Sequence, residues 1–361
     1  MPFTPTQTLI GASMLGVSAY HVLILNGGVL GVSGFAHRTA SWFIFKHRKH
    51  ISVKAHKGDT LSDVNPDPEY LALISIVGLL AGGLVLGLFY QPLETQLQTQ
   101  LVDIYSTTSV TQAQRIGLAL PRLIARAEYF SPQLSNGCTS GHMLCGVSRL
   151  APRSLLATAT FFPVGVLTHL LLGQTSLFST KLVVEGPIGR PTWQVCQQFG
   201  GKKLILRFCQ TAFHFALGLI ASGMLRPSKI LNFLHLTPTA MKDGTWDPSL
   251  AMIILAGILP QAFVWLASLR KHVRQAGTRP KFSETWNIPM PVPEWRKGVD
   301  ARLIIGAALF GIGWGMCGIC PGPAIVLSGA GISGGIESHG WMRIGVWIVG
   351  FVSGGLVGRI F

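Results

Sequence analysis

Charged residues are scarce in this sequence of 361 residues. They make up 12% of it, about half of the ~25% that is usual in soluble domains, and only 14 residues are Asp or Glu. This scarcity argues against a soluble enzyme. Hydrophobic residues make up 48%, which excludes a disordered chain, because disordered segments are poor in apolar side chains. The sequence also lacks a Gly-x-x-x-x-Gly-Lys-Ser/Thr segment, so no phosphate-binding loop of the ATPase type is expected.

Cysteine is sparse as well. The six cysteines, too few for a disulfide scaffold, are Cys138, Cys145, Cys196, Cys209, Cys317 and Cys320. Cys317 and Cys320 have the spacing of redox motifs, but the sequence around them lacks the strand–helix–strand pattern of a thioredoxin-like motif. No acidic residue or histidine lies near them in sequence, which argues against a zinc site. We therefore predict no metal and no cofactor.

Long apolar runs occupy much of the remaining sequence. A membrane-spanning helix needs ~20 mostly apolar residues. The runs lie at 9–33, 70–90, 154–172, 204–224, 249–269, 302–316, 324–336 and 341–361. We predict an all-α, polytopic protein in a lipid bilayer. Glycines four residues apart, such as Gly27/Gly31, Gly78/Gly82 and Gly311/Gly315, are expected to let neighbouring helices approach closely.

The net charge of +15 is concentrated in a few loops. Segments 38–57, 173–207 and 270–297 hold 18 of the 29 Lys and Arg residues. Cytosolic loops of membrane proteins carry an excess of Lys and Arg, so we predict that these three loops face the cytosol. Topology therefore explains most of the charge, and nucleic-acid binding is not expected.

Three landmarks occur twice in the same order along the chain. They lie at 26–34, 67–72 and 137–142, and again at 221–227, 247–251 and 318–323. A basic loop follows the first helix of one half but the second helix of the other, a pattern that indicates inverted topology. We predict a first transmembrane repeat at 1–172, a cytosolic connector at 173–203 and a second transmembrane repeat at 204–361.

Two of these landmarks predict interrupted helices. Segments 137–142 and 315–323 combine glycine and cysteine with a further helix breaker inside apolar sequence. Paired broken helices at matching positions indicate a binding site near the middle of the bilayer. Helices that begin after the breaks would direct backbone N–H groups at an anion. The candidate site residues are Gly137, Cys138, Thr139, Ser140, Gly141, His142, Cys145, Cys317, Gly318, Cys320, Pro321 and Gly322.

Thiols at the breaks leave two kinds of chemistry open. A neutral S–H can donate a hydrogen bond to a sulfur-bearing anion, which favours a transporter or channel. A thiol whose pKa is lowered becomes a nucleophile, which favours a membrane enzyme that relays sulfane sulfur or reducing equivalents. Arg149 and Arg153 follow the first break. They either hold an anion at the mouth of the site or extend to the membrane interface.

These residues resemble the YeeE/YedE sulfur-transport family. The strongest matching stretch is 136–154, and the second runs from 300–303 through Gly313-Trp314-Gly315 to 320–324. The layout is similar to two half-size permeases of that family joined in one chain. The sequence departs from the family at 116–132, which contains three charges and two prolines, and it has no cysteine before Cys138.

The resemblance implies both a fold and a function. Characterised members of the family take up thiosulfate through an hourglass of helices whose short broken helices meet at a central constriction. Cysteines at that constriction pass thiosulfate by S–H hydrogen bonds, and Cys138 and Cys320 would be those cysteines here. We expect transport rather than catalysis, in a multi-pass protein of the plasma membrane, with a cytosolic sulfur carrier as a further partner. The alternatives are the thiol-relay enzyme and a chain that does not transport because 115–135 fails to insert.

Overall fold

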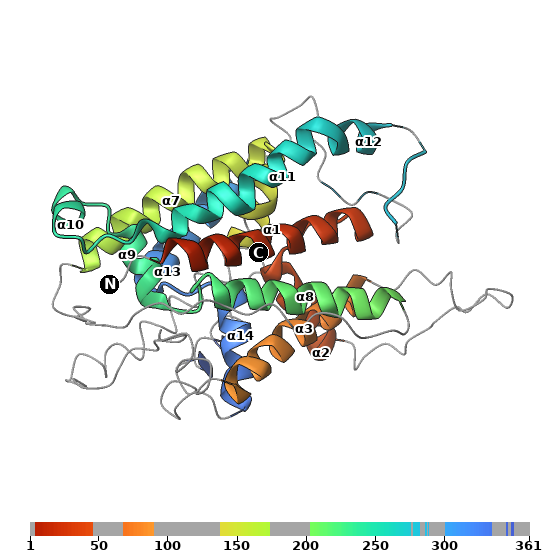
Figure 1. The fold of residues 1–361 in the computed structure, drawn as a ribbon, viewed down its shortest axis with the longest axis horizontal. Helices are drawn as coiled ribbons and strands as arrows, with labels where there is room; N and C mark the ends of the chain where they lie inside the picture. Colours follow the sequence, from red (N-terminus) through yellow and green to blue (C-terminus); the bar gives the residue numbers. More distant parts are fainter. Residues whose placement is uncertain are drawn as a thin grey trace, which may run out of the picture.

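Every regular element in the described part of the chain is a helix. The computed structural model describes residues 4–45, 68–89, 138–173, 203–275, 277–281, 286, 288, 300–333, 344–345 and 348–349. In the described residues, the helices that are long and apolar enough to cross a bilayer are Pro5–Leu25, Leu71–Leu88, Pro152–Leu171 and Pro248–Arg274. The bent pair of helices Ala301–Cys317 and Pro321–Ile332 adds a fifth span if the pair crosses the bilayer as one. The prediction of an all-α membrane protein is confirmed (Figure 1).

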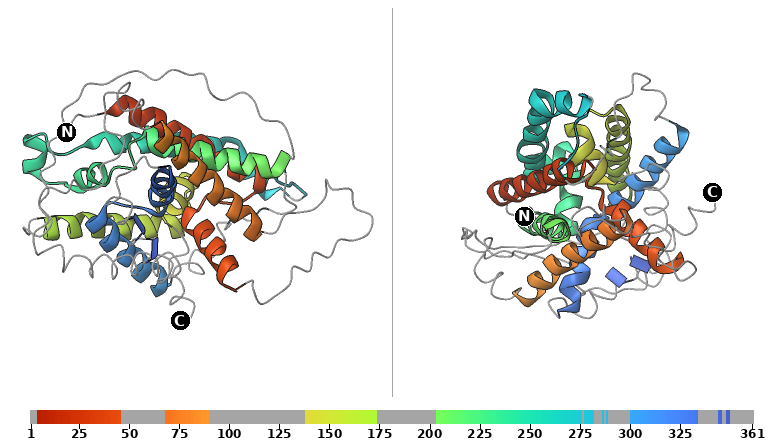
Figure 2. Two further views of the ribbon diagram at one scale, coloured as in Figure 1. Left: turned by 90° about the horizontal axis from the view of Figure 1, so that it is seen from below. Right: turned by 90° about the vertical axis from the view of Figure 1, so that its right-hand side faces the viewer.

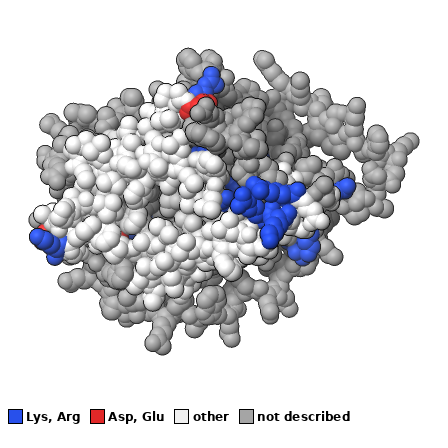
Figure 3. Space-filling view, turned by 90° about the horizontal axis from the view of Figure 1, so that it is seen from above, with Lys and Arg blue, Asp and Glu red and all other residues white. Residues whose placement is uncertain are grey.

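Apolar side chains cover much of the outer surface of this bundle. Exposed fractions reach 74% for Phe263, 63% for Leu171 and 54% for Ile305. Figure 3 shows the largest group of Lys and Arg on one part of a mostly uncharged face, with smaller groups of charged residues at its left edge and at its top. Soluble monomers rarely expose apolar patches of this kind, whereas lipid tails solvate them. The exposed leucine, isoleucine and phenylalanine side chains therefore form the surface that faces the bilayer.

The first half of the chain contains five described helical elements. They are α1 (Pro5–Asn26), α2 (Val32–Phe45), α3 (Pro68–Leu88), the π-helix η2 (Ser140–Val147) and α7 (Pro152–Gly173). The apolar run 9–33 is not one span, because α1 ends at Gly27, whose φ of 64° is favourable for glycine. The predicted loop 38–57 also begins as helix, since α2 continues to Phe45.

The second half has the same kind of break after its first helix. Its elements are α8 (Lys203–Ala221), α9 (Pro227–Leu234), α10 (Pro238–Lys242), η3 (Pro248–Ala251), η4 (Ile253–Ile258), α11 (Leu259–Val264), η5 (Trp265–Leu269), α12 (Arg270–Arg274), α13 (Ala301–Cys317) and α14 (Pro321–Ile332). The elements from η3 to α12 form one helical segment, Pro248–Arg274, in which only Met252 separates η3 from η4. Two predicted loops, 226–245 and 270–297, therefore contain the short helices α9, α10 and α12. The apolar run 341–361 lies mostly outside the described residues.

Glycines at helix contacts bring backbones close together. A Cβ added to Gly78 would lie 2.5 Å from the carbonyl oxygen of Cys209 on α8, and one added to Gly311 would lie 2.5 Å from that of Phe161 on α7. Gly315 likewise faces the backbone of Gly165. Close packing at Gly78/Gly82 and Gly311/Gly315 is thus confirmed. Gly27 and Gly31 instead belong to the break between α1 and α2, and Gly31 has no neighbour within 4 Å of such a Cβ.

Exposed basic side chains mark one end of the bundle. The C-terminal end of α1 packs against the segment that contains Trp265, Leu269 and Val273, and Ile24 accepts a hydrogen bond from the backbone N–H of Lys281. The exposed residues Arg270, Lys271 and Arg274 lie on the same segment. We call this the basic end. The opposite end holds the N-terminus of α1, where Thr8 donates to the carbonyl oxygen of Ser222.

The ends of the predicted connector lie at different ends of the bundle. Helices α1 and α8 are antiparallel, because Ser18 contacts His214 while Thr8 contacts Ser222, so α8 begins at the basic end. Helix α7 finishes at the opposite end, where the ring of His169 packs against that of His235 (Figures 1 and 2). Residues 174–202 lie outside the described residues, and the placement of the connector stays a prediction.

We expect single cysteines engineered into 38–57 and 270–297 to react with an impermeant thiol reagent from the same side of sealed vesicles. The reason is that Lys and Arg are retained preferentially on the cytosolic side. The mass that the reagent adds to the protein is measured before and after the vesicles are permeabilised. Reaction of the two segments from opposite sides would contradict the inverted arrangement of the two halves.

Candidate functional site

The described residues of the two segments that the sequence predicts as breaks, 138–142 and 315–323, meet in the structure. Thr139 Oγ1 donates a hydrogen bond to Cys320 Sγ over 3.6 Å, although the two residues are 181 positions apart. Cys138 and Cys320 each have 3% of their surface exposed. The cysteines of both segments are therefore buried within the bundle, and the two segments lie next to each other.

The second break is produced by glycine and proline. Helix α13 ends at Gly318, which has a φ of 62° and donates its N–H to the carbonyl oxygen of Trp314. Cys320 is extended, with φ −108° and ψ 162°, and Pro321 then begins α14. Proline is favoured at this first helical position, because its missing N–H would have no partner there. The two helices consequently meet at a bend of 43°, with Cys320 at the start of the second.

The first break connects to a third helix start. Cys138 Sγ and Ser140 Oγ are 3.0 Å apart, and Ser140 Oγ accepts the backbone N–H of Val32, the first residue of α2, over 3.3 Å. A Cβ added to Gly322 would lie 3.9 Å from Cγ2 of the same valine. The N-terminal ends of η2, α14 and α2 therefore converge. We call this cluster the junction; it consists of Val32, Cys138, Thr139, Ser140, Gly141, Gly318, Cys320, Pro321 and Gly322.

Four of the predicted site residues lie elsewhere or cannot be placed. His142 Nδ1 is 3.1 Å from Ser154 Oγ, so this buried histidine joins η2 to α7. Cys145 Sγ donates to the carbonyl oxygen of Leu30 over 3.7 Å, beside the junction. Cys317 is half-buried at the last position of α13. Gly137 lies outside the described residues.

The structure also reveals residues that the sequence analysis missed. The turns at Gly27 and Gly223, with φ of 64° and 71°, separate α1 from α2 and α8 from α9. Both glycines lie within repeated landmarks, and this repetition is the signal that could have identified them as breaks. Lys229 on α9 is 1% exposed, and its Nζ donates to Thr4 Oγ1 and Thr8 Oγ1, each over 2.8 Å.

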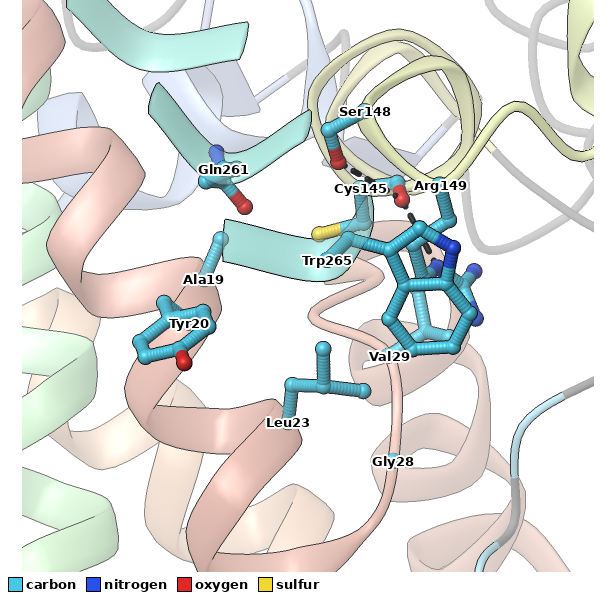
Figure 4. Close-up of a pocket in the computed structure, with 10 residues that line it drawn as sticks. All are labelled: Ala19, Tyr20, Leu23, Gly28, Val29, Cys145, Ser148, Arg149, Gln261 and Trp265. Atoms are coloured by element: carbon cyan, nitrogen blue, oxygen red, sulfur yellow. Dashed lines mark hydrogen bonds between the residues drawn. The ribbon is translucent and has the colours of Figure 1, made fainter. Parts of the chain in front are cut away.

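A pocket lies beside the junction, toward the basic end. It is narrow and partly open to the exterior, and it is lined by Ala19, Tyr20, Leu23, Gly28, Val29, Cys145, Ser148, Arg149, Gln261 and Trp265. Figure 4 shows α1 on one side of it, the end of η2 with Cys145 and Arg149 on the other, and the helical segment with Gln261 and Trp265 above.

The junction is suited to an anion. Helix N-termini present backbone N–H groups and a partial positive charge, and three of them converge here. Thiols and hydroxyls from Cys138, Thr139, Ser140 and Cys320 add polar groups that can donate hydrogen bonds, and none of the junction residues is acidic. All five described cysteines are free thiols.

This fold and this junction define a polytopic helical membrane protein with a polar site between broken helices. A "Probable transporter" of Xylella fastidiosa strain 9a5c is 36% identical to this chain over 118 residues, which cover 33% of this chain and 70% of that protein. Another "Probable transporter" of the same strain is 27% identical over 165 residues, or 46% of this chain and 93% of that protein. The chain belongs to the family of these proteins.

Two further comparisons complete this result. Residues 203–357 match the model of a family of unknown function (DUF6691). No solved structure matches the chain. The matched shares also show that the two Xylella proteins are about half as long as this chain.

Proposed function

We propose that this protein is a membrane transporter or channel that passes a small sulfur-containing anion, with thiosulfate as the first candidate, through the junction. The observation that carries the proposal is the contact of Thr139 with Cys320, which unites the two cysteine-containing breaks. The names of the half-length relatives support transport. The resemblance to the YeeE/YedE family, which rests on the same two breaks, supports a sulfur anion.

The junction would replace the water shell of the anion with fixed donors. Taking an unpaired charge out of water costs several kcal/mol or more, and each hydrogen bond to a charged group returns ~1.5–3 kcal/mol. Both thiols are buried in this structure, so passage requires the junction to open.

Two inverted halves would place this site between them. Helix α1 packs on α8. Each of these two helices also packs on a further element: α8 on α3, and α1 on η4. Exchanging α1 with α8 and α3 with η4 maps these contacts onto one another, as a two-fold relation between the halves requires. Relatives about half as long support the same division.

The test is uptake of radiolabelled thiosulfate by cells that lack their own thiosulfate and sulfate transporters, with and without this chain. We expect uptake only when the chain is present in the plasma membrane, and competition by unlabelled thiosulfate but not by chloride. Uptake that matches the empty strain at a verified membrane level of the protein would contradict the proposal. Pull-down of a cytosolic sulfur carrier is the corresponding test for a partner.

We also expect Cys138 and Cys320 to remain thiols during turnover. A neutral S–H donates to an anion, whereas a thiolate would repel it. Differential alkylation and mass spectrometry before and after uptake measure this directly. A disulfide between Cys317 and Cys320 that forms and breaks in step with activity would instead favour the thiol-relay enzyme.

A further inference from the structure

Arg149 brings a buried positive charge into the pocket beside the junction. Arg149 is 8% exposed, and its Nε donates a hydrogen bond to the carbonyl oxygen of Cys145 over 2.8 Å. Within the described residues no carboxylate contacts this guanidinium, and no acceptor takes the N–H groups of its two Nη atoms. A buried cation without a counter-charge is costly, so this pocket is arranged to receive negative charge.

Other pocket residues add donors and define its position. The hydroxyl of Tyr20 and the indole N–H of Trp265 have no hydrogen-bond partner in the described part of the chain, and both residues line the pocket. Cys145, also in the lining, bonds to Leu30, two residues before the start of α2. The pocket is thus adjacent to the junction. Trp265 lies only five residues before Arg270, which places the pocket at the basic end.

We propose that this pocket is an anion-binding site in which Arg149 holds a small oxyanion next to the junction, at the basic end of the pathway. The guanidinium presents several N–H groups in one plane, a geometry that matches two oxygens of a sulfur oxyanion. The identity of the anion as thiosulfate rests on the proposed function. The binding site itself rests on the pocket and its unpaired charge.

The test is anion binding to the purified full-length chain in detergent, followed by tryptophan fluorescence at constant ionic strength. Sodium thiosulfate and sodium sulfate are titrated separately, with sodium chloride as the balancing salt. We expect a saturable change for thiosulfate that Trp265→Phe removes. Arg149→Gln should weaken binding at least about tenfold, because losing one partner of a buried charge pair is costly, and Arg149→Lys should fall between the two.

Arg153→Gln is the matched control. Arg153 is four residues after Arg149 and carries the same charge, but its side chain does not line the pocket. It should bind like the wild type. Thermal melting establishes that Arg149→Gln is folded. Equal affinity of wild type and Arg149→Gln, or no saturable binding of either oxyanion, overturns the inference. Arg149-dependent binding in a protein that fails the uptake assay would overturn the proposed function and keep this site.

Discussion

Replacing Cys320 by alanine is expected to lower the initial rate of thiosulfate uptake about tenfold to a hundredfold. Cys320 begins α14 at the junction and is bonded to Thr139 across the two halves. A hydrogen bond to a charged group is worth ~1.5–3 kcal/mol, and each 1.4 kcal/mol added to a barrier slows passage about tenfold. Cys138→Ala should have a similar effect, because Cys138 lies on the facing break beside Ser140. The measurement is labelled uptake normalised to the protein level in the membrane.

The matched control is Cys209→Ala. Cys209 is a half-buried cysteine on α8, where its neighbours are α3 residues rather than the junction. We expect near wild-type uptake, and the same for Cys196→Ala in the connector. Cys320→Ser separates sulfur from simple donation, because serine keeps a donor of similar size. We expect serine to fail nearly as badly as alanine. Wild-type uptake by both Cys138→Ala and Cys320→Ala would exclude a cysteine-lined pathway.

The pairing of the two breaks shows what the sequence could and could not predict. Glycine, cysteine and proline at 315–323 identify a helix interruption by local chemistry alone, and the structure places it at Gly318 and Pro321. The repeated order of landmarks predicted that a second break would match it. The hydrogen bond between Thr139 and Cys320 involves residues 181 positions apart, and local propensity carries no information about such a contact.

The breaks at Gly27 and Gly223 were missed for a physical reason. An apolar run such as 9–33 is long enough for one span, and a single left-handed glycine ends a helix without changing mean hydropathy. The only sequence signal for the third helix start at Val32 was therefore the repeated landmark at 26–34. Arg149 was identified from its position after the first break, but its burial beside Trp265 depends on packing between distant helices.

Replacing Gly318 by alanine is expected to destabilise the protein more than the same change at any exposed turn. Gly318 has a φ of 62°, and a Cβ there would lie 2.6 Å from the carbonyl oxygen of Pro227. A non-glycine residue in the left-handed region costs roughly 1–2 kcal/mol, and overpacking adds roughly 1–3 kcal/mol. Thermal melting of the purified protein measures the loss. Uptake per folded molecule should also fall, since Cys320 lies only two residues further on.

Gly244→Ala measures separately the stability cost of placing alanine in the left-handed backbone conformation. Gly244 has a nearly identical φ of 66°, but nothing lies within 4 Å of a Cβ built on it, and it is exposed between α10 and η3. Its substitution should therefore cost only the left-handed strain and leave uptake unchanged. The difference in melting temperature between the two variants then reports the contact of Gly318 with Pro227, which joins the bend of α13 and α14 to the start of α9. Equal melting temperatures and equal uptake would mean that this bend can relax freely, and that its geometry does not control the position of Cys320.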